Sequence, residues 1–538
     1  MELLSDAPPL LLTGFMGTGK STVGRLAAQR AGLPFVDLDD AIVEEAGESV
    51  PSLFASRGEA GFRALEAAIL RRLLAAPGPR VIALGGGALV DPALRGEALE
   101  RGCVVALSAT PRTIAARAAM TRGARPLLDG APDREARIRE LLSARAAVYA
   151  QAHARVVTDG VPPEEVAARV LRAYADRPLF VPLGDKSYAV RFASDGPASV
   201  ADAVAELAPS SVFVVTDENV SRLWGAPLLA ALAALGKPAA AVTVLRPGEE
   251  HKRLAAVEAA LTAMIDAGAD RDALVLAHGG GVVTDIGGFA ASTLLRGVRW
   301  LAAPTTLLSM VDASVGGKTG VDLGPAKNAV GTFHQPSAVV ASPAALATET
   351  DRAYRSGLAE VVKSACIGDP DLHVLLEREA YRVLARDPVL LTEVIRRSVA
   401  VKAAIVARDE RESGERALLN FGHTLGHALE AEGGFVRLAH GEAVSLGMVA
   451  MLRVGCALGA TDRAAADRVI GLLARLGLPT RIEDEPVSAA LRFLSLDKKR
   501  RGSSVRTILL RDIGSTFVEP MPLDRLSALL ERVATAAA

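Results

Sequence analysis

The chain contains the stretch Ala417-Leu-Leu-Asn-Phe-Gly-His423-Thr-Leu-Gly-His427-Ala-Leu-Glu430, followed by His440-Gly-Glu442, and this stretch predicts a helix that carries a histidine cluster. Three of the eight histidines of the chain lie between positions 423 and 440. His423 and His427 are four positions apart in a segment with helical apolar spacing, so their side chains project from one face. This pattern is typical of a metal site, with solvated or core histidines as the alternative. A zinc protease is disfavoured because its motif needs a glutamate where Thr424 stands.

The composition bounds the size and class of the protein. The chain has 538 residues, too many for one core, and 50% of them are hydrophobic, so about three units of ~150 residues are expected. Lys plus Arg (61) nearly balance Asp plus Glu (62), which disfavours a nucleic-acid or anionic-membrane surface and favours small-molecule partners. Three scattered cysteines, the acidic residues Glu2 and Asp6, and the lack of an uncharged apolar run of ~20 residues predict a cytoplasmic protein.

The N-terminal region contains a phosphate-binding loop. A short apolar strand over residues 9–13 leads into Gly14-Phe-Met-Gly17-Thr-Gly19-Lys20-Ser21, and helical spacing follows over residues 22–31. In this strand-loop-helix context the backbone N–H groups can turn toward phosphate, Lys20 can reach the β- and γ-phosphates, and Ser21 can hold Mg²⁺. The predicted ATP and Mg²⁺ residues are Gly17, Thr18, Gly19, Lys20, Ser21, Thr22 and Asp37.

Carboxylates and glycines follow the next two strands expected in this region. Phe35-Val-Asp37-Leu-Asp39-Asp40 ends a strand, where alternating carboxylates suit Mg²⁺ and an acceptor hydroxyl. Gly85-Gly86-Gly87 follows a strand over residues 81–84 and permits very close approach by a ligand. Three arginines, Arg63, Arg125 and Arg145, could bind anionic groups, although a single arginine is more often a solvated surface residue.

Together these residues resemble shikimate kinase over nearly all of the first 170 positions. The resemblance implies ATP-dependent phosphorylation of shikimate to shikimate 3-phosphate, with Asp39 as substrate ligand and base and Arg125 in a lid over the transferring phosphate. It assigns shikimate binding to Asp39, Arg63, Gly85, Gly86, Gly87 and Arg145. A gluconate-type small-molecule kinase is the competing interpretation, but it should not need a carboxylate clamp of this form.

A short linker is expected after the kinase. A helical pattern closes it near residue 172, Ala175-Asp-Arg-Pro178 breaks the helix, and a new strand series begins at Phe180. We therefore predict a P-loop domain over residues 1–172, with a parallel sheet, and a linker over residues 173–179.

From Ser211 onward, strands alternate with helices, and polar or glycine-rich segments follow each strand. The strand over residues 212–215 precedes Asp217 and Asn219, where a nucleotide ribose could be held. The strand over residues 274–277 leads through His278-Gly279-Gly280-Gly281 into a helix, an arrangement that suits the pyrophosphate of a dinucleotide. A triple glycine without the Gly-x-Gly-x-x-Gly fingerprint is weak evidence by itself.

Further motifs give this region its context. They are Arg296-Gly, Pro304-Thr305-Thr306, Asp312 with Gly317-Lys318-Thr, Lys327-Asn328, Ser356-Gly-Leu-Ala-Glu360-x-x-Lys363, Lys402, Arg416-x-x-x-Asn420, the histidine stretch and Asp497-Lys498-Lys499. Their order resembles 3-dehydroquinate synthase, or its close sugar-phosphate cyclase relatives, over residues 180–538. The resemblance implies a Rossmann-like NAD-binding α/β domain over residues 180–340 and a mainly helical metal- and substrate-binding domain over residues 341–538. The whole chain then resembles a fusion of two enzymes of chorismate, and hence aromatic amino acid, biosynthesis.

The second resemblance implies conversion of 3-deoxy-D-arabino-heptulosonate 7-phosphate to 3-dehydroquinate and phosphate. NAD⁺ would oxidise a hydroxyl, so that the neighbouring C–H becomes acidic enough for phosphate elimination, and the NADH formed would then restore the alcohol. Zn²⁺ or Co²⁺ bound by Glu360, His423 and His440 would polarise the hydroxyl that is oxidised. His427 is implied near the substrate, for proton transfer.

The same resemblance implies the remaining site residues. The NAD contacts are Asp217, Asn219, Glu249, Lys252, Gly280, Gly281, Asp285, Thr305, Thr306, Asp312, Lys318, Lys327, Asn328 and Thr348. The substrate contacts are Arg296, Asn328, Lys363, Lys402, Arg416, Asn420, His427 and Lys498. The residues assigned to catalysis in the two halves are Lys20, Asp39, Arg125, Asp312, Lys318, Lys363, Lys402 and His427.

Some points stay open at this stage. Glu349-Thr350 replaces the Leu-Pro usual in the synthase family, which leaves the assignment of Thr348 uncertain, and residues 118–121 offer no clear arginine to stack on adenine. The C-terminal half could close another sugar phosphate for a natural-product pathway, or either half could be a degenerate binding scaffold. The synthase family also suggests a homodimer.

Overall fold

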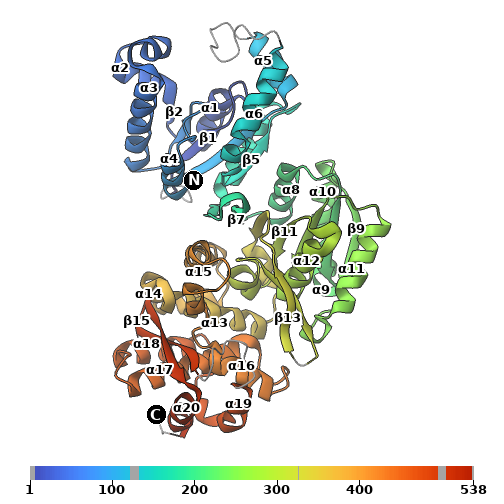
Figure 1. Cartoon of the computed structure of the whole chain (residues 1–538), viewed down its shortest axis with the longest axis vertical. Helices are drawn as coiled ribbons and strands as arrows, with labels where there is room; N and C mark the ends of the chain where they lie inside the picture. The colour runs from blue at the N-terminus through green and yellow to red at the C-terminus, as the bar shows by residue number, and fades with distance from the viewer. Residues whose placement is uncertain (1–6, 121–132, 325, 495–503, 536–538) are drawn as a thin grey trace. The chain divides into compact units, whose positions relative to one another are not determined.

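The computed structural model describes residues 7–120, 133–324, 326–494 and 504–535, so the predicted site residues Arg125 and Lys498 lie outside the described residues. The chain divides into two compact units, Met1–Ala208 and Pro209–Ala538. Figure 1 labels their elements, and each unit is described by itself. No helix in the described residues has both the length and the apolar composition that crossing a membrane requires.

The first unit is an α/β domain with a five-stranded parallel sheet in the order β2-β3-β1-β4-β5. Its strands are β1 (Leu10–Thr13), β2 (Phe35–Asp37), β3 (Val81–Ala83), β4 (Cys103–Ser108) and β5 (Ala154–Val157). Its helices up to the predicted linker are α1 (Lys20–Ala31), α2 (Leu38–Ala46), α3 (Val50–Ala75), α4 (Pro92–Arg101), α5 (Pro111–Met120), α6 (Arg134–Ala150) and α7 (Pro163–Ala175). The predicted P-loop domain with a parallel sheet is confirmed.

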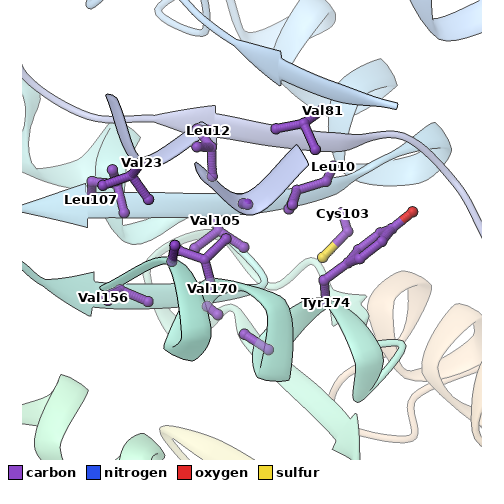
Figure 2. Close-up of a cluster of buried hydrophobic side chains, with 14 of the residues drawn as sticks. Leu10, Leu12, Val23, Val81, Cys103, Val105, Leu107, Val156, Val170 and Tyr174 are labelled. Atoms are coloured by element: carbon purple, nitrogen blue, oxygen red, sulfur yellow. The ribbon is translucent and has the colours of Figure 1, made fainter. Parts of the chain in front are cut away.

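The sheet is buried on both faces, as a parallel sheet requires. Because side chains alternate along a strand, Leu10 and Leu12 of β1 pack into one apolar cluster while Leu11 packs into another. Figure 2 shows the first cluster, in which Leu10 and Leu12 lie near Val105 of β4 and Val170 of α7. Packing on both faces fixes the strand ends from which the site residues project.

A hairpin and a helix complete the first unit after α7. Strands β6 (Leu179–Val181) and β7 (Tyr188–Phe192) pair antiparallel, and α8 (Gly196–Leu207) contacts β5 and α7. Asp202 of α8 forms an ion pair with Arg172, with 2.9 Å between the charged atoms, and Glu206 forms one with Arg191. The boundary between the two compact units therefore lies after Ala208. The linker over residues 173–179 was inferred from a change of sequence pattern, and it stays a prediction.

The second unit begins with an α/β portion. Parallel strands β14 (Ala338–Ala341), β11 (Arg299–Pro304), β10 (Leu274–Gly279), β8 (Val212–Asp217) and β9 (Ala239–Leu245) lie in that order. The helices are α9 (Glu218–Val220), α10 (Ala226–Ala234), α11 (Leu254–Asp266) and α12 (Gly281–Thr293), and β12 (Lys318–Leu323) pairs antiparallel with β13 (Ala326–Phe333). The expected alternation of strands and helices is confirmed.

The rest of the second unit is mainly helical, as expected. Its helices are α13 (Asp351–Gly368), α14 (Pro370–Leu384), α15 (Pro388–Arg408), α16 (His423–Glu432), α17 (His440–Ala457), α18 (Arg463–Arg475), α19 (Val487–Leu494) and α20 (Leu523–Thr535). An antiparallel hairpin, β15 (Ser504–Asp512) and β16 (Ser515–Pro522), packs on α17 and α13. Figure 1 shows this hairpin among the helices.

Candidate active sites

The phosphate-binding loop lies between β1 and α1, as predicted. Gly14, Gly17 and Gly19 have φ values of 137°, 81° and 94°, a region that favours glycine. A Cβ on Gly14 would lie 2.3 Å from the Leu107 carbonyl oxygen, so that position also requires glycine for space. The Lys20 ammonium donates hydrogen bonds to the Gly14 and Phe15 carbonyl oxygens at 2.9 and 3.1 Å. The Lys20 side chain is thus held by hydrogen bonds to the backbone at the start of the loop.

The predicted Mg²⁺ residues meet at the end of β2. The Ser21 hydroxyl donates a 2.6 Å hydrogen bond to Asp37, although the two residues come from different elements. Thr18 is buried inside the loop, and Thr22 lies exposed in the first turn of α1. Hydroxyl and carboxylate oxygens are ligands that Mg²⁺ accepts in phosphate sites.

The predicted shikimate residues converge on the Gly85-Gly86-Gly87 segment. Cβ atoms placed on these glycines would lie 3.2 Å from Asp39 Oδ1, 4.0 Å from Arg145 Nη1 and 2.5 Å from Arg63 Nη2, in that order. Arg145 donates a 3.1 Å hydrogen bond to the Gly86 carbonyl oxygen. The structure therefore brings the carboxylate and both described arginines of the predicted clamp to one glycine segment.

Asp39 differs from the prediction in its local structure. The expected strand ends at Asp37, and Asp39 lies in the first turn of α2, where its N–H donates to the Asp37 side chain. Burial, with the neighbouring Asp37 charge, raises the pKa of Asp39. A raised pKa suits a carboxylate that has to take up a proton.

Two residues of the first unit, Glu66 and Arg117, lie at the site but were not predicted as site residues. Glu66 is buried, receives a 2.6 Å hydrogen bond from Arg63 and lies near Gly85; its i,i+3 spacing from Arg63 was the available signal. Arg117 lies in the last turn of α5, directly before residues 118–121, and it donates to the carbonyl oxygens of Gly17 and Thr158 at 3.3 and 2.8 Å.

Apart from Asp312, Lys318 and Thr348, the predicted NAD residues of the second unit form two groups. The first lies at the carboxyl ends of neighbouring parallel strands: Asp217 ends β8, Gly280 and Gly281 follow β10, and the Thr305 N–H after β11 donates to the Gly279 carbonyl oxygen at 3.0 Å. A Cβ on Gly280 would lie 3.2 Å from the Thr306 side chain. Asp217 caps α9 by accepting from the Asn219 and Val220 N–H groups. This strand edge is where α/β sheets bind nucleotides.

The second group surrounds the buried Lys252. Its ammonium lies 2.5 Å from Asp285, 2.6 Å from the Asn328 side-chain oxygen and 3.6 Å from Glu249. Burial raises the pKa of Asp285 to about 6, against the opposing effect of Lys252. Lys327 lies 3.8 Å from Glu249. All members of this group were predicted as NAD residues.

Thr348, whose assignment the sequence left uncertain, contacts a residue that was not predicted. Its hydroxyl oxygen accepts a 3.0 Å hydrogen bond from the Trp224 indole. The neighbouring Glu349 is half-buried and accepts a 3.1 Å hydrogen bond from the Leu307 N–H, so the substituted glutamate has a partner inside the fold.

The three predicted metal ligands come together from three helices. Glu360 Oε1, from α13, lies 3.5 Å from His423 Nε2 at the start of α16 and 3.5 Å from His440 Nε2 at the start of α17. Their ligand atoms lie within 4.8 Å of one another. Glu360 Oε1 is buried and has no hydrogen-bond partner in the part of the chain that the structure describes. A carboxylate oxygen left over between two imidazoles fits a divalent cation.

The remaining charged residues pair around this cluster. Lys363 contacts Glu360, and Lys402 lies 2.5 Å from Asp312 Oδ1. Burial alone would raise the pKa of Asp312, but the Lys402 and Lys363 ammonium groups outweigh it and hold this pKa well below its usual range. The His427 ring centroid lies 5.2 Å from that of His423.

Glu412 links two predicted residues and was itself missed. Its carboxylate contacts the Lys318 ammonium and accepts a 2.7 Å hydrogen bond from the Asn420 amide. Arg416 is buried and donates to the Gly316 carbonyl oxygen at 2.9 Å. Arg296 is exposed after α12, and none of these contacts involves it. The Asp-Glu-Arg-Glu412 run, just before Arg416, was the available signal for Glu412.

Comparison with known proteins agrees with both resemblances. The family model of shikimate kinase matches residues 16–175, that of the 3-dehydroquinate synthase N-terminal domain matches residues 242–356, and that of its C-terminal domain matches residues 357–500. The chain is 45% identical to a 3-dehydroquinate synthase of Acidithiobacillus ferrooxidans over 342 residues, which cover 64% of this chain and 94% of the relative. It is 44% identical to that of Halorhodospira halophila over 342 residues, 64% of this chain and 95% of the relative.

A solved structure is similar to the same part of the chain. It is the 2-epi-5-epi-valiolone synthase of Streptomyces hygroscopicus subsp. jinggangensis 5008 with NAD⁺ and Zn²⁺ bound, 31% identical, with a TM-score of 0.58, covering 64% of this chain and 96% of that one. The P-loop and glycine-segment site of the first unit and the Glu360-centred cluster of the second agree with these matches. The chain therefore belongs to the 3-dehydroquinate synthase family and carries, before its synthase part, a domain of the shikimate kinase family.

Proposed function

We propose that this chain catalyses two non-consecutive steps of the shikimate pathway. The first unit would phosphorylate shikimate at the expense of ATP, and the second would convert 3-deoxy-D-arabino-heptulosonate 7-phosphate to 3-dehydroquinate and phosphate. The observation that supports this most is that each unit has its own cluster of chemical groups: Asp39 with the arginines at Gly85-Gly86-Gly87, and Glu360 between His423 and His440.

In the proposed kinase reaction, the loop before α1 binds the ATP phosphates through backbone N–H groups and Lys20. Ser21 and Asp37 would hold Mg²⁺, which neutralises phosphate charge. Arg63 and Arg145 hold the shikimate carboxylate, and Asp39 accepts the proton of the attacking hydroxyl. Arg125 is proposed at the transferring phosphate from the family resemblance alone.

The proposed synthase site needs NAD⁺ and a divalent metal. When bound, these would take up and return a hydride and polarise the hydroxyl that is oxidised. The strand-edge residues and the Lys252 group would hold the dinucleotide, and Glu360, His423 and His440 would hold Zn²⁺ or Co²⁺. The valiolone synthase, solved with NAD⁺ and Zn²⁺ bound, supports this cofactor set.

The other residues would handle the substrate. Lys318, Lys363, Lys402, Arg416 and Asn420 supply cationic and amide groups for its phosphate, carboxylate and hydroxyls, with Arg296 and Lys498 proposed from the resemblance alone. Asp312, kept ionised by its lysine neighbours, can accept a hydrogen bond from the reacting hydroxyl, and an imidazole nitrogen of His427 can transfer a proton. A homodimer through the second unit and a cytoplasmic location are further proposals that rest on the family and on composition.

The substrate choices are tested on the purified full chain. Phosphate release is measured with the heptulosonate phosphate and with sedoheptulose 7-phosphate, and ATP consumption with shikimate and with gluconate. We expect the first member of each pair to be turned over. Preference for sedoheptulose 7-phosphate would instead support a natural-product cyclase, preference for gluconate would remove the shikimate assignment, and no turnover of any substrate would favour a degenerate scaffold.

A further inference from the structure

Glu430 is a buried carboxylate beside the metal cluster that the proposed mechanism does not use. It lies on α16, and its side chain is 2% exposed. Its two oxygens have different partners: Oε2 lies 3.3 Å from His440 Nδ1, and Oε1 lies 3.2 Å from the Lys327 ammonium. Since a buried carboxylate is costly without partners, this geometry ties Glu430 to both.

The contact with His440 determines how that ring can act. His440 Nε2 lies 3.5 Å from Glu360 Oε1, so this nitrogen is the one directed at the proposed metal position. Nδ1 faces Glu430. A carboxylate that accepts from one imidazole nitrogen fixes the tautomer, orients the ring and makes the other nitrogen a better ligand.

The contact with Lys327 leads to the cofactor side. Lys327 lies on β13, 3.8 Å from Glu249 and 4.7 Å from the centre of the Phe435 ring. Glu249 also pairs with the buried Lys252. Through its second oxygen, Glu430 therefore holds a lysine of the group proposed to bind NAD⁺.

Glu430 could in principle be a metal ligand itself, because His427, Glu430 and His440 also lie close enough to share an ion. The hydrogen bonding favours Glu360 as the ligand. Glu360 Oε1 is buried without a hydrogen-bond partner among the described residues, whereas both oxygens of Glu430 already have one.

We propose that Glu430 is a positioning residue that orients His440 toward the metal with one oxygen and holds Lys327 at the cofactor side with the other. The proposal rests on the proposed function of the second unit. It predicts that metal affinity and NAD⁺ affinity both depend on a side chain that touches neither ligand, and that the two binding events are coupled.

The test uses the full chain after removal of bound metal. Co²⁺ affinity and its visible spectrum, and NAD⁺ affinity, are measured for the wild type, Glu430→Gln and Glu432→Gln. Glu432 lies on the same helix and pairs with Arg437 at 2.9 Å, so it is a matched control. We expect Glu430→Gln to weaken Co²⁺ binding about 10- to 100-fold with a shifted spectrum, and to weaken NAD⁺ binding, while Glu432→Gln matches the wild type.

Other outcomes separate the possibilities. Equal behaviour of Glu430→Gln and Glu432→Gln would overturn the positioning role, and loss of Co²⁺ as complete as in His423→Ala would make Glu430 a ligand instead. A wild-type chain that binds neither Co²⁺ nor NAD⁺ would refute the proposed function itself.

A second variant keeps the test decisive if Glu430→Gln does not fold. Lys327→Met leaves every proposed metal ligand intact but removes the partner of Glu430 Oε1. We expect a measurable loss of Co²⁺ affinity, smaller than that of Glu430→Gln. Unchanged Co²⁺ affinity and spectrum in a folded Lys327→Met chain would contradict the coupling.

Discussion

Asp39 shows how the surroundings of one side chain prepare it for chemistry. Its carboxylate lies near Gly85 and faces the same segment as Glu66, and desolvation by the surrounding protein, with the Asp37 charge, raises its pKa, whereas the adjacent Asp40 pairs with Arg25 at 3.7 Å. Asp39→Asn should lower kcat for shikimate phosphorylation by about 10²- to 10⁴-fold, because the variant cannot accept the hydroxyl proton. Asp40→Asn should leave kcat unchanged. Equal kcat values for the two variants, measured by ATP consumption, would remove Asp39 from the reaction.

Glu349 gives a pH-dependent contribution to stability. Burial raises its pKa to about 7, from a usual value of 4.5. A raised folded-state pKa means that the folded chain binds the proton more tightly than the unfolded chain, so stability is highest below pH 4.5 and falls as the pH rises toward 7. Above pH 7 the folded chain carries a desolvated Glu349 carboxylate, and the contribution of this group to the free energy of unfolding is lost.

Glu349→Gln should therefore remove this pH dependence while keeping an acceptor for the Leu307 N–H. Between pH 5 and pH 8, the wild type should lose about 2–3 kcal/mol more than the variant. The measurement is urea unfolding of the second unit at both pH values. Parallel pH profiles would show that Glu349 is not titrating in this range.

For single residues, the sequence could predict those that belong to motifs, but not every residue that these contact in the folded chain. Glu360 is distant in sequence from the histidines, yet the motif order was enough to group it with them, and the structure places it between them. Glu412 and Glu430 were missed because their importance comes from contacts with Lys318 and Lys327, which lie on another element. Such contacts depend on tertiary packing rather than on local spacing.

At the scale of elements, a close helix contact positions one of the ligands. Gly441 follows His440 in the first turn of α17, and a Cβ there would lie 1.9 Å from the Ser356 carbonyl oxygen on α13. The two helices that carry Glu360 and His440 can approach only because this residue is glycine.

Gly441→Ala should push α17 from α13, destabilise the second unit by about 1–3 kcal/mol and weaken Co²⁺ binding. Gly471→Ala in α18 is the control, because a Cβ there meets nothing within 4 Å and should stabilise by about 0.5–1 kcal/mol. Thermal unfolding measures the change in stability, and Co²⁺ titration measures the change in metal affinity. A folded Gly441→Ala chain with wild-type Co²⁺ affinity would show that this packing does not set the ligand geometry.

The elements that sequence could predict were those with strong apolar patterns. Buried strands such as β8 and β10 were expected, although each extends two residues further than predicted. The β12–β13 hairpin was not expected, since Gly320 and Gly331 lie opposite each other in it and glycine weakens a strand pattern. A Cβ on Gly331 would lie 2.1 Å from the Thr319 carbonyl oxygen, so close backbone pairing explains the glycine.

For the whole molecule, the two activities should differ in their metal requirement. Treatment with a chelator, followed by its removal and addition of Mg²⁺ alone, should restore ATP consumption with shikimate but not phosphate release. Addition of Zn²⁺ or Co²⁺ should then restore phosphate release, because Glu360, His423 and His440 form a nitrogen-rich site that suits these ions better than Mg²⁺. Full phosphate release with Mg²⁺ alone would contradict the metal assignment.

The order of motifs along the chain was sufficient to predict two enzymes and their fold classes, because each motif demands a specific strand, loop or helix context. It was less informative about where the units part. Helix α8 carries Asp202 and Glu206, whose ion pairs with Arg172 and Arg191 bind it into the first unit, and such pairs leave no periodic signal in the sequence.

The central claim is that one chain carries two separate active sites, and the most direct measurement is a crossed inactivation. Lys20→Met and His423→Ala are made in the full chain, and each variant is assayed for ATP consumption with shikimate and for phosphate release from the heptulosonate phosphate. We predict that Lys20→Met abolishes only the first activity and His423→Ala only the second. Loss of both activities in either folded variant, or phosphate release that survives His423→Ala, would contradict the account.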